Sequence, residues 1–416
     1  MNEKISSFLT ERIAGNDFPS AAYLVAEKGE IVYQGALGYA VVEPERIPAK
    51  VDTIYDVASL TKPLVTGLLL ATLVEQGSVE LDQIVEHYLP ELIEFERPPG
   101  AREMVDYDCL DVGIKDLVTH HSAYQSWKPF YLLVNEGVEI RNQILLQIAN
   151  RIPVQWEPEV IYSDLNFIML AGIIEKLFDQ TIDRTFSDVI AGPLRLTESC
   201  YNPLPQMPIA RISASELGNE YERQTCIGKG YLPGGNASVN ERGDRAGEVI
   251  DSERPIATLP DGRVSARNPF RDYQIWGQVH DGNAYFMGGV AGHAGLFSTA
   301  EEVFKIALQF LPQYTQLLKP ETCELFRTNF TKGMNEDRSF AFQLASTEGS
   351  TAGTKMSPES FGHNGFTGTS LWIDPVKDRI FVLLTNRTHN HPLPFVNINS
   401  VRRRFHDLAI DELEKR

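Results

Sequence analysis

Ser59 and Lys62 form the one Ser-x-x-Lys sequence in the chain, and they open a strongly apolar stretch, residues 60–74. If this stretch is a helix, side chains three positions apart share one face, about 5–6 Å apart at Cβ. A serine hydroxyl is a useful nucleophile only when a neighbouring base takes its proton. A lysine can do so if burial or a nearby cation keeps its amine partly neutral. The pair therefore predicts attack on an acyl group, with the N–H of Ser59 as an oxyanion donor at the helix start.

A tyrosine and a carboxylate precede a second apolar stretch. Tyr162, Ser163 and Asp164 come directly before residues 165–178, whose apolar residues have helical spacing. A tyrosine oxygen in a loop at this place can relay a proton between Lys62, Ser59 and a leaving group. Asp164 is also a favoured residue type for a helix cap, and capping does not exclude a role in the site. We predict that Tyr162 completes a Ser–Lys–Tyr trio.

The third candidate segment lies near the C-terminal end. His363, Asn364 and Gly365 begin a β-rich part of the chain. A glycine there lets a strand edge approach a substrate closely. The backbone N–H of Phe366 is then a candidate for a second oxyanion donor beside that of Ser59.

The elements that position these residues follow from hydrophobic periodicity and turn signals. Helices are predicted over residues 3–14, 59–77, 114–121, 141–149, 165–178, 300–310 (with Thr299 as its cap) and 401–415. Strands are predicted over residues 21–27, 31–39, 369–374 and 379–385. Strands thus stand at both ends and helices between them. The fold class is α+β, with an antiparallel sheet built from both termini, flanked by helices and interrupted by a mostly helical region.

Residues 205–275 differ from the rest, because they are rich in Gly, Pro, Asn, Arg and charge and have few apolar runs. A structureless loop of that length is unusual in a compact domain. We therefore expect a loop-rich insertion with little secondary structure of its own, lying over a cleft. The whole is expected to be one composite domain, with a sheet region (1–58 and 285–416) and a helical region (59–284) that includes the insertion.

Composition indicates an ordinary globular protein and bears on its partners. Hydrophobic residues make up 43% and charged residues 23% of the 416 positions, and the net charge is −18. Such acidity argues against nucleic-acid and anionic-membrane partners, which select basic patches. No apolar run reaches the roughly 18 residues that span a bilayer, so residues 64–74 are predicted to form a core helix. The oligomeric state is left open.

The cysteines and the N-terminal residues bear on the cellular compartment in which the protein is expected. Cys109, Cys200, Cys226 and Cys323 are far apart and form no Cys-x-x-Cys pair, which favours free thiols in reducing conditions. Residues 1–11 are polar and of mixed charge, without the apolar core of a signal peptide. We therefore expect a cytoplasmic protein.

Together these motifs resemble those of the serine β-lactamase and penicillin-binding-protein superfamily. Ser59-Leu-Thr-Lys62, Tyr162-Ser-Asp164 and His363-Asn-Gly365 match, in order and spacing, the Ser-x-x-Lys, Tyr-x-Asn and Lys/His-x-Gly elements of its class C β-lactamase, DD-peptidase and esterase branch. The resemblance covers nearly the whole chain apart from about 205–275. Residues 279–295 and 362–368 are also similar to a bacterial subset that includes penicillin-binding-protein-4B-like proteins and amidases of muramyl peptides.

The resemblance implies a β-lactamase/transpeptidase-like fold and a cofactor-free, metal-free serine hydrolase. Such an enzyme forms an acyl-enzyme from a small-molecule or peptide substrate, that is, an ester, amide or peptide, including cell-wall-derived compounds. The residues implied as catalytic are Ser59, Lys62 and Tyr162, with the N–H groups of Ser59 and Phe366 as oxyanion donors. The residues implied as substrate-binding are Asp164, His363, Asn364 and Gly365.

Two departures from the family pattern bear on activity. Asp164 stands where the family usually has Asn, and a carboxylate only accepts hydrogen bonds. Its charge would hold Lys62 protonated and weaken it as a base, which argues against efficient β-lactam turnover. His363 stands where many members have Lys, and we expect its titration near neutrality to make substrate-carboxylate binding depend on pH.

Several alternatives stay open. The chain could be a binding or regulatory protein that kept the fold and lost turnover, and the sequence does not choose among esterase, amidase, peptidase and lactamase. We favour a structural role over a catalytic one for His120 and His121. His389 and His391 lack a third ligand at suitable spacing, so we expect a surface loop there and no zinc site.

Overall fold

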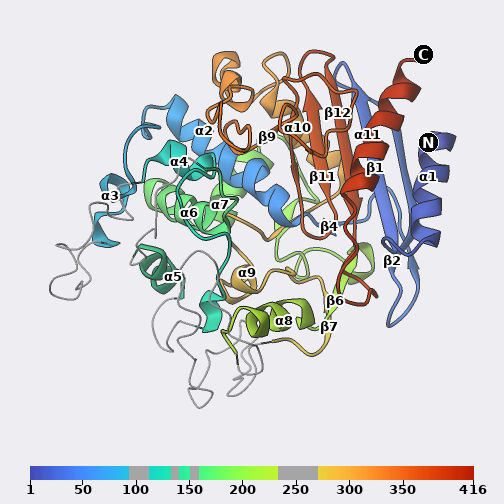
Figure 1. Cartoon of the computed structure of the whole chain (residues 1–416), viewed down its shortest axis with the longest axis horizontal. Helices are drawn as coiled ribbons and strands as arrows, with labels where there is room; N and C mark the ends of the chain where they lie inside the picture. The colour runs from blue at the N-terminus through green and yellow to red at the C-terminus, as the bar shows by residue number, and fades with distance from the viewer. Residues whose placement is uncertain (93–111, 133–139, 150–158, 233–269) are drawn as a thin grey trace.

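Both ends of the chain meet in one antiparallel sheet, which lies toward one side of the molecule (Figure 1). The computed structural model describes residues 1–92, 112–132, 140–149, 159–232 and 270–416. In these residues a seven-stranded sheet has the order β3-β2-β1-β12-β11-β10-β9. The strands are β3 (Ile47–Pro48), β2 (Glu30–Val41), β1 (Ser20–Glu27), β12 (Arg379–Thr385), β11 (Ser370–Asp374), β10 (Phe361–Asn364) and β9 (Gln343–Leu344). The predicted fold class, α+β with an antiparallel sheet built from both termini, is confirmed.

The middle of the sheet joins the two ends of the chain directly. β1 pairs with β12 in register from Ala21 opposite Thr385 to Glu27 opposite Arg379. All seven residues of β12 are buried, as are the first seven of the eight in β1. Strands buried on both faces are typical of a sheet covered by helices on each side.

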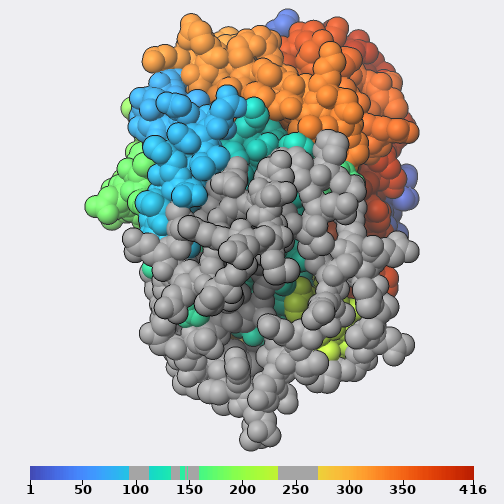
Figure 2. Space-filling view, turned by 60° about the vertical axis from the view of Figure 1, so that its left-hand side comes forward, coloured from blue at the N-terminus to red at the C-terminus, as the bar shows by residue number. Residues whose placement is uncertain are grey.

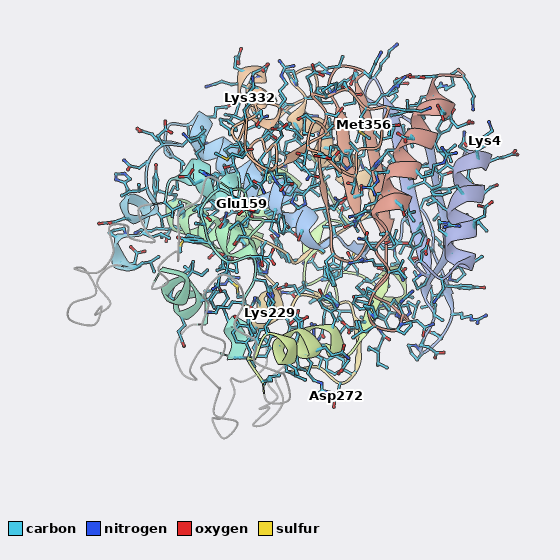
Figure 3. All side chains as sticks on the ribbon, viewed as in Figure 1. Lys4, Glu159, Lys229, Asp272, Lys332 and Met356 are labelled. Atoms are coloured by element: carbon cyan, nitrogen blue, oxygen red, sulfur yellow. The ribbon has the colours of Figure 1, made fainter. Side chains whose placement is uncertain are left out.

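Two helices cover one face of this sheet and a third covers the other. α1 (Glu3–Ala14) and α11 (Asn399–Leu413) lie side by side on the first face (Figure 1). Lys4 of α1, labelled in Figure 3, forms an ion pair with Glu412 of α11, with 3.1 Å between Nζ and Oε1. α10 (Ala300–Ala307) packs against β1 and β12 from the second face. Thr299 caps α10 as predicted, because its side chain accepts a hydrogen bond from the N–H of Glu302.

A helical region lies beyond the second face of the sheet (Figure 1). Its helices are α2 (Leu68–Glu75), α3 (Val85–Tyr88), α4 (Ile114–Val118), α5 (Ile140–Ala149), α6 (Asp164–Phe178), α7 (Ile182–Phe186), α8 (Glu220–Gly228) and α9 (Gly282–Phe286). Two small sheets tie it to the rest: β4 (Tyr55–Asp56) with β8 (Leu296–Ser298) and β5 (Cys200–Tyr201), and β6 (Ala214–Leu217) with β7 (Gln274–Trp276). The expected division into sheet and helical regions at residues 58 and 285 stays a prediction.

The helix that carries Ser59 and Lys62 is not one regular α-helix. It begins with a 3-10 turn, Ala58–Leu60, continues as a π-helical segment, Lys62–Gly67, and becomes α-helical only in α2. Within the described residues, Ala58–Glu75 is the one helical stretch whose length and composition would suit a membrane span, and 83% of it is buried inside the protein. Its far end contacts the C-terminal half of the chain, because Glu75 accepts hydrogen bonds from the N–H of Lys319 and from Thr322 Oγ1. Figure 2 shows blue atoms of the N-terminal part next to orange atoms of the C-terminal half.

The insertion contains more structure than the sequence predicted. Its described parts, residues 205–232 and 270–275, contain β6, α8 and the start of β7. The expectation of little secondary structure is therefore wrong for these parts, and residues 233–269 lie outside the described residues. α8 has few apolar residues, and burial of Cys226 and Glu222 fixes its inner face.

Substitution of Phe405 tests how much the packing of α11 against the sheet stabilises the protein. It is fully buried, and its ring packs edge-on against Tyr23 at 6.2 Å. We expect Phe405→Ala to lower the free energy of unfolding by about 3–5 kcal/mol, because it leaves a cavity under α11. Urea denaturation followed by circular dichroism measures this. The exposed neighbour Arg404→Ala is the matched control, and an equal loss in both variants would contradict the packing role.

Candidate active site

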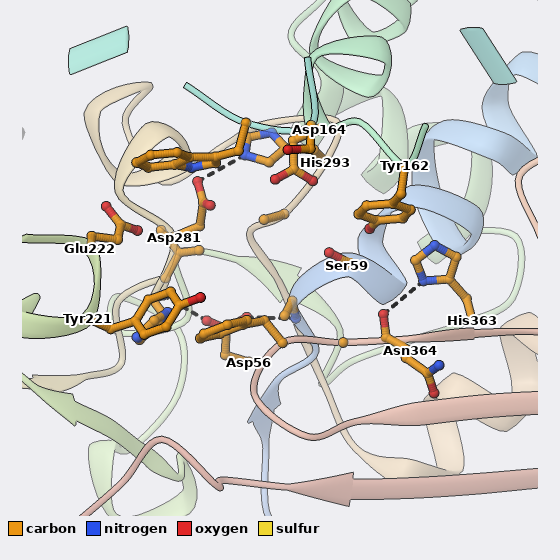
Figure 4. Close-up of a pocket in the computed structure, with 18 of the residues that line it drawn as sticks. Asp56, Ser59, Tyr162, Asp164, Tyr221, Glu222, Asp281, His293, His363 and Asn364 are labelled. Atoms are coloured by element: carbon orange, nitrogen blue, oxygen red, sulfur yellow. Dashed lines mark hydrogen bonds and ion pairs between the residues drawn. The ribbon is translucent and has the colours of Figure 1, made fainter. Parts of the chain in front are cut away.

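A cavity of about 560 Å³ lies between the sheet edge at β10 and the helical region. It brings together residues that are far apart in the sequence. In Figure 4, Ser59 lies between Tyr162 and His363 on one side and Asp281 and Glu222 on the other. All the residues predicted for the site line this cavity except Lys62, which lies buried behind Ser59.

The turn before Ser59 is held by a buried carboxylate. Asp56, at the end of β4, accepts hydrogen bonds from the N–H of Ala58 (2.9 Å) and of His280 (2.8 Å). Ala58 has a left-handed backbone with φ of 49°, which is unusual for a residue with a side chain. Asp56 therefore fixes a strained turn that presents Ser59 to the cavity, and nothing in the sequence pattern indicated this role.

Lys62 has no exposure to solvent, and its ammonium group is fully enclosed by polar partners. Its Nζ donates to Ser59 Oγ (3.0 Å), to Asp164 Oδ1 (2.6 Å) and to the backbone oxygen of His293 (3.1 Å). The predicted contact between Ser59 and Lys62 is thus present in the structure. The third bond ties the catalytic helix to the Gly-rich segment 288–295.

The surroundings of Lys62 favour its charged form. Burial lowers the pKa of the ammonium, but the charges and hydrogen bonds of Asp164 and Tyr162 outweigh burial and raise that pKa above its ordinary value. The expectation that Asp164 holds Lys62 protonated agrees with this direction. The neutral amine that a base requires is therefore a minor form near neutral pH.

Asp164 does not act as the cap of α6. It is the first residue of the helix, after Ser163 at the cap position, and no side-chain bond caps this end. Its carboxylate is directed to Lys62 instead, and its own N–H donates to Ser126 (2.9 Å). The capping alternative is therefore wrong, and the charge of Asp164 belongs to the site.

Tyr162 is positioned by His120, which sequence reasoning assigned only a structural role. The backbone oxygen of His120 accepts the N–H of Ile161 (2.9 Å), and its Nδ1 accepts the N–H of Ser163 (3.1 Å). The His120 ring also packs on the Tyr162 ring, with 4.5 Å between the ring centroids. His120 thus holds the peptides on both sides of Tyr162. Its left-handed backbone, with φ of 61°, places the ring where it can do so.

The Tyr162 phenol lies beside Ser59 (Figure 4). Burial and the charge of Asp164 raise its pKa, whereas Lys62 and Ser59 lower it, and burial is the largest effect. Lys62 Nζ lies 5.0 Å from the centre of the ring. A phenol beside both groups can carry a proton between them.

His363 lies beside Tyr162, but it is not charged near neutrality. Burial, Lys62 and Arg338 together hold its pKa well below the ordinary value. The expected pH dependence from His363 titration is therefore wrong. Nδ1 contacts the backbone oxygen of Asn364 at 2.9 Å, and Nε2 has no partner among the described residues.

Packing within the protein itself requires a glycine at position 365, and the predicted role of Gly365 in substrate binding stays a prediction. A Cβ at this position would lie 1.9 Å from Thr369 Oγ1 and 2.5 Å from the backbone oxygen of Val57. Thr369 Oγ1 donates to that same oxygen (2.9 Å). The absence of a side chain therefore lets the loop after β10 close against the turn before Ser59. Asn364 lines the cavity, and its side-chain oxygen accepts a hydrogen bond from Thr351.

This closure brings the two candidate oxyanion donors to one cavity wall. Thr367 Oγ1 donates to the backbone oxygen of Asp56 (2.8 Å), which adds a second link between the two loops. Among the residues that the structure describes, the N–H groups of Ser59 and Phe366 donate to no other protein group, and both residues line the cavity. Two free N–H groups beside a nucleophile suit an oxyanion hole.

The far side of the cavity holds acidic residues that the motifs did not predict. Asp281 pairs with His293 (2.9 Å). Burial raises the pKa of Asp281, but His293, the N–H of Ala284 and the charge of Lys62 together lower it to about 2. Glu222 of α8 accepts hydrogen bonds from Tyr131 and from the N–H of Gly282, and burial raises its pKa to about 7. The insertion therefore contributes a wall of the cavity.

The described residues contain no group of three His, Cys, Asp or Glu side chains that could hold a metal ion. His389 is fully buried rather than on a surface loop, since its ring accepts the N–H of Val42 (2.8 Å) and contacts the oxygen of Ser215 (2.9 Å). Cys200, Cys226 and Cys323 are free, as expected, and Cys109 lies outside the described residues.

Comparison with solved structures supports the fold. EstCE1, a hydrolase with promiscuous acyltransferase activity, is 18% identical and superimposes with a TM-score of 0.64 over 97% of each chain. The octameric penicillin-binding protein homologue from Pyrococcus abyssi is also 18% identical, with a TM-score of 0.63 over 98% of this chain and 77% of its own. A class C beta lactamase gives a TM-score of 0.62 at 14% identity, over 98% and 97%. These likenesses show a shared β-lactamase/transpeptidase-like fold.

Sequence relatives and the family profile agree with the motifs. A protein named "Putative D-alanyl-D-alanine carboxypeptidase" from Escherichia coli (strain K12) is 29% identical over 392 residues, 90% of this chain and 79% of its own. A protein of the same name from Salmonella agona (strain SL483) is 30% identical over 393 residues, 90% and 80% of the two chains. The beta-lactamase family profile matches residues 5–402. The resemblance predicted from the motifs is confirmed, and the chain belongs to the beta-lactamase family.

Proposed function

We propose that this serine hydrolase of the beta-lactamase family cleaves amide bonds of cell-wall-derived peptides through an acyl-enzyme on Ser59. The observation that carries the proposal is the 3.0 Å contact between Lys62 Nζ and Ser59 Oγ beside the Tyr162 phenol and two free N–H groups. Nucleophile, base, proton relay and oxyanion donors are the parts that acyl transfer requires.

The proposed steps are those of a two-stage acyl transfer. Ser59 Oγ forms a bond to the substrate carbonyl carbon while its proton passes to the neutral amine of Lys62. Tyr162 gives its proton to the leaving nitrogen as the carbon–nitrogen bond breaks, and it regains one from Lys62. Water then attacks the ester on Ser59, its proton passes to the same relay, and the hydroxyl of Ser59 is restored.

The substrate class is supported by the relatives and by the shape of the cavity. Proteins that are 29–30% identical bear the name of a D-alanyl-D-alanine carboxypeptidase. A cavity of about 560 Å³ has room for several residues of a peptide. The acidic wall formed by Glu222 and Asp281 is compatible with a peptide that presents N–H donors or an ammonium group.

One observation favours a second candidate, a binding protein with little turnover. The ion pair between Lys62 and Asp164 keeps the base in its charged form. The intact Ser–Lys–Tyr trio argues for catalysis, because binding alone does not require it. Two predictions separate these candidates.

The first prediction concerns covalent labelling of Ser59. We expect a fluorophosphonate probe to modify the wild-type protein at Ser59, since the oxygen of an activated serine bonds to the phosphorus of the probe and displaces fluoride. Mass spectrometry of the Ser59 peptide detects the adduct, and p-nitrophenyl acetate hydrolysis, D-Ala-D-Ala peptide cleavage and nitrocefin hydrolysis measure turnover. Ser59→Ala should abolish both labelling and turnover, by at least about a thousandfold. Labelled Ser59 without turnover of any substrate in the panel would favour the binding candidate.

The second prediction concerns pH. Because the pKa of Lys62 is raised, its neutral amine becomes available only as pH rises, and kcat/KM should increase into the alkaline range. Asp164→Asn removes the carboxylate that raises this pKa and leaves burial, which lowers it. The rising limb should then move to lower pH, and activity at pH 7 should increase on the order of tenfold.

The matched control for this pH prediction is Asp179→Asn. Asp179 is exposed, lies at the other end of α6, and has a left-handed backbone that Asn adopts readily. A profile that is identical in the wild-type protein and in Asp164→Asn would show that Lys62 is not the base.

A further inference from the structure

The loop that carries the Phe366 N–H is held by two arginines from the C-terminal part of the chain, the buried Arg402 and the partly buried Arg387. Arg402 of α11 donates through Nη2 to the backbone oxygens of Gly365 (2.8 Å) and Thr369 (3.0 Å). Arg387 donates through Nε to the backbone oxygen of Phe366 (2.6 Å). Consecutive carbonyl groups on this loop therefore each accept a hydrogen bond from a guanidinium group.

The bond from Arg402 acts on the peptide unit that supplies the second oxyanion donor. The carbonyl of Gly365 and the N–H of Phe366 belong to one planar trans peptide, in which these two groups point in opposite directions. Arg402 holds this oxygen together with the N–H of Gly368, which donates to it at 3.0 Å, so the N–H of Phe366 is fixed in the opposite direction. Phe366 and Arg402 both line the cavity, and the N–H of Phe366 has no acceptor among the described residues. Arg402 thus helps to fix the direction of this donor.

Neither guanidinium group is neutralised by a carboxylate within the described residues. Arg402 Nη1 donates to Asn399 (2.8 Å), and Arg387 Nη1 donates to the backbone oxygen of Val396 (2.8 Å). Burial and the neighbouring Arg387 lower the pKa of Arg402 to about 9, so it stays charged at neutral pH. A buried charge without a counter-charge is costly, and such a cost is commonly retained where it serves function.

We propose that Arg402 is a positioning residue of the oxyanion hole, which orients and polarises the Gly365–Phe366 peptide so that its N–H stabilises negative charge on the substrate oxygen. A cation on the carbonyl end of a peptide draws electrons toward that end and strengthens the N–H as a donor. The positive charge also favours an oxyanion over a neutral carbonyl, so the effect is larger in the transition state than in the bound substrate. This inference rests on the proposed acyl transfer at Ser59.

The test compares Arg402→Gln and Arg402→Lys with the wild-type protein, and exposed Arg404→Gln on the same helix is the control. Substrates are p-nitrophenyl acetate, which has no carboxylate, and a D-Ala-D-Ala peptide, which has one. Phenylboronic acid reports on the oxyanion hole, because its boron bonds to Ser59 Oγ, the hydroxyl proton is released, and a tetrahedral anion results. Thermal unfolding and fluorophosphonate labelling give the folded, active fraction.

For Arg402→Gln we expect kcat on the uncharged ester, per labelled site, to fall about tenfold to a hundredfold, with KM changed less than about threefold. The inhibition constant of phenylboronic acid should rise by a similar factor. Arg402→Lys keeps a charge and a donor, so it should recover part of both losses. Arg404→Gln should match the wild-type protein.

Three outcomes would overturn the inference. A rise in KM for the carboxylate-bearing peptide, with kcat on the ester intact, would make Arg402 a substrate-binding residue instead. If the loss of activity matches the loss of protein that the probe can label, and the unlabelled Arg402→Lys protein keeps the wild-type affinity for phenylboronic acid, Arg402 has a purely structural role. A wild-type protein that the probe does not label would overturn the proposed function, and this inference with it.

Discussion

The site is organised around one fully buried ammonium group, that of Lys62. A charge without solvent is stable only if its donors are all matched, and the three partners come from three parts of the fold: the 3-10 turn before the π-helical segment, the first residue of α6, and the Gly-rich segment at residue 293. Gly292 lets this last segment pack closely against α6, because a Cβ at Gly292 would lie 2.3 Å from the backbone oxygen of Phe167. The same three contacts that make the charge tolerable also bring the nucleophile, its base and the acidic side of the cavity together.

A second constraint sets the distance between the sheet and the helical region. The loop that follows β10 is bonded to the turn before Ser59 through Thr367 and Thr369, and from behind it is bonded to α11 through Arg402. Two free N–H groups thus belong to segments that cannot move independently. Such rigidity is what electrostatic stabilisation of a transition state requires, because donors that are already oriented need no reorganisation during the reaction. The sheet supports the site in this direct sense, although its central strands line none of the cavity.

Hydrophobic periodicity and turn signals were sufficient to predict most helices and strands. They also predicted that both ends of the chain contribute strands to one sheet. The proximity of Ser59 and Lys62 also followed from spacing, although their helix is a mixture of 3-10, π and α geometry. What the sequence could not provide depends on three-dimensional neighbours. The low pKa of His363 arises from burial beside Lys62 and Arg338, and α8 becomes a wall of the cavity only through buried polar contacts. Residues that bond to backbone atoms, such as His120, Asp56 and Arg402, leave no spacing pattern that could reveal them.

The pairing of β1 with β12 has a consequence for how the protein is made. Ala21 leaves the ribosome long before Thr385, its partner across the sheet, is synthesised. The central strand pair, and with it both hydrophobic layers of the sheet, cannot form until the whole segment between these two strands has emerged. Nascent β1 and β2 form a hairpin whose inner edge is open during that interval, so elongation rate and access to chaperones bear directly on the yield of native protein.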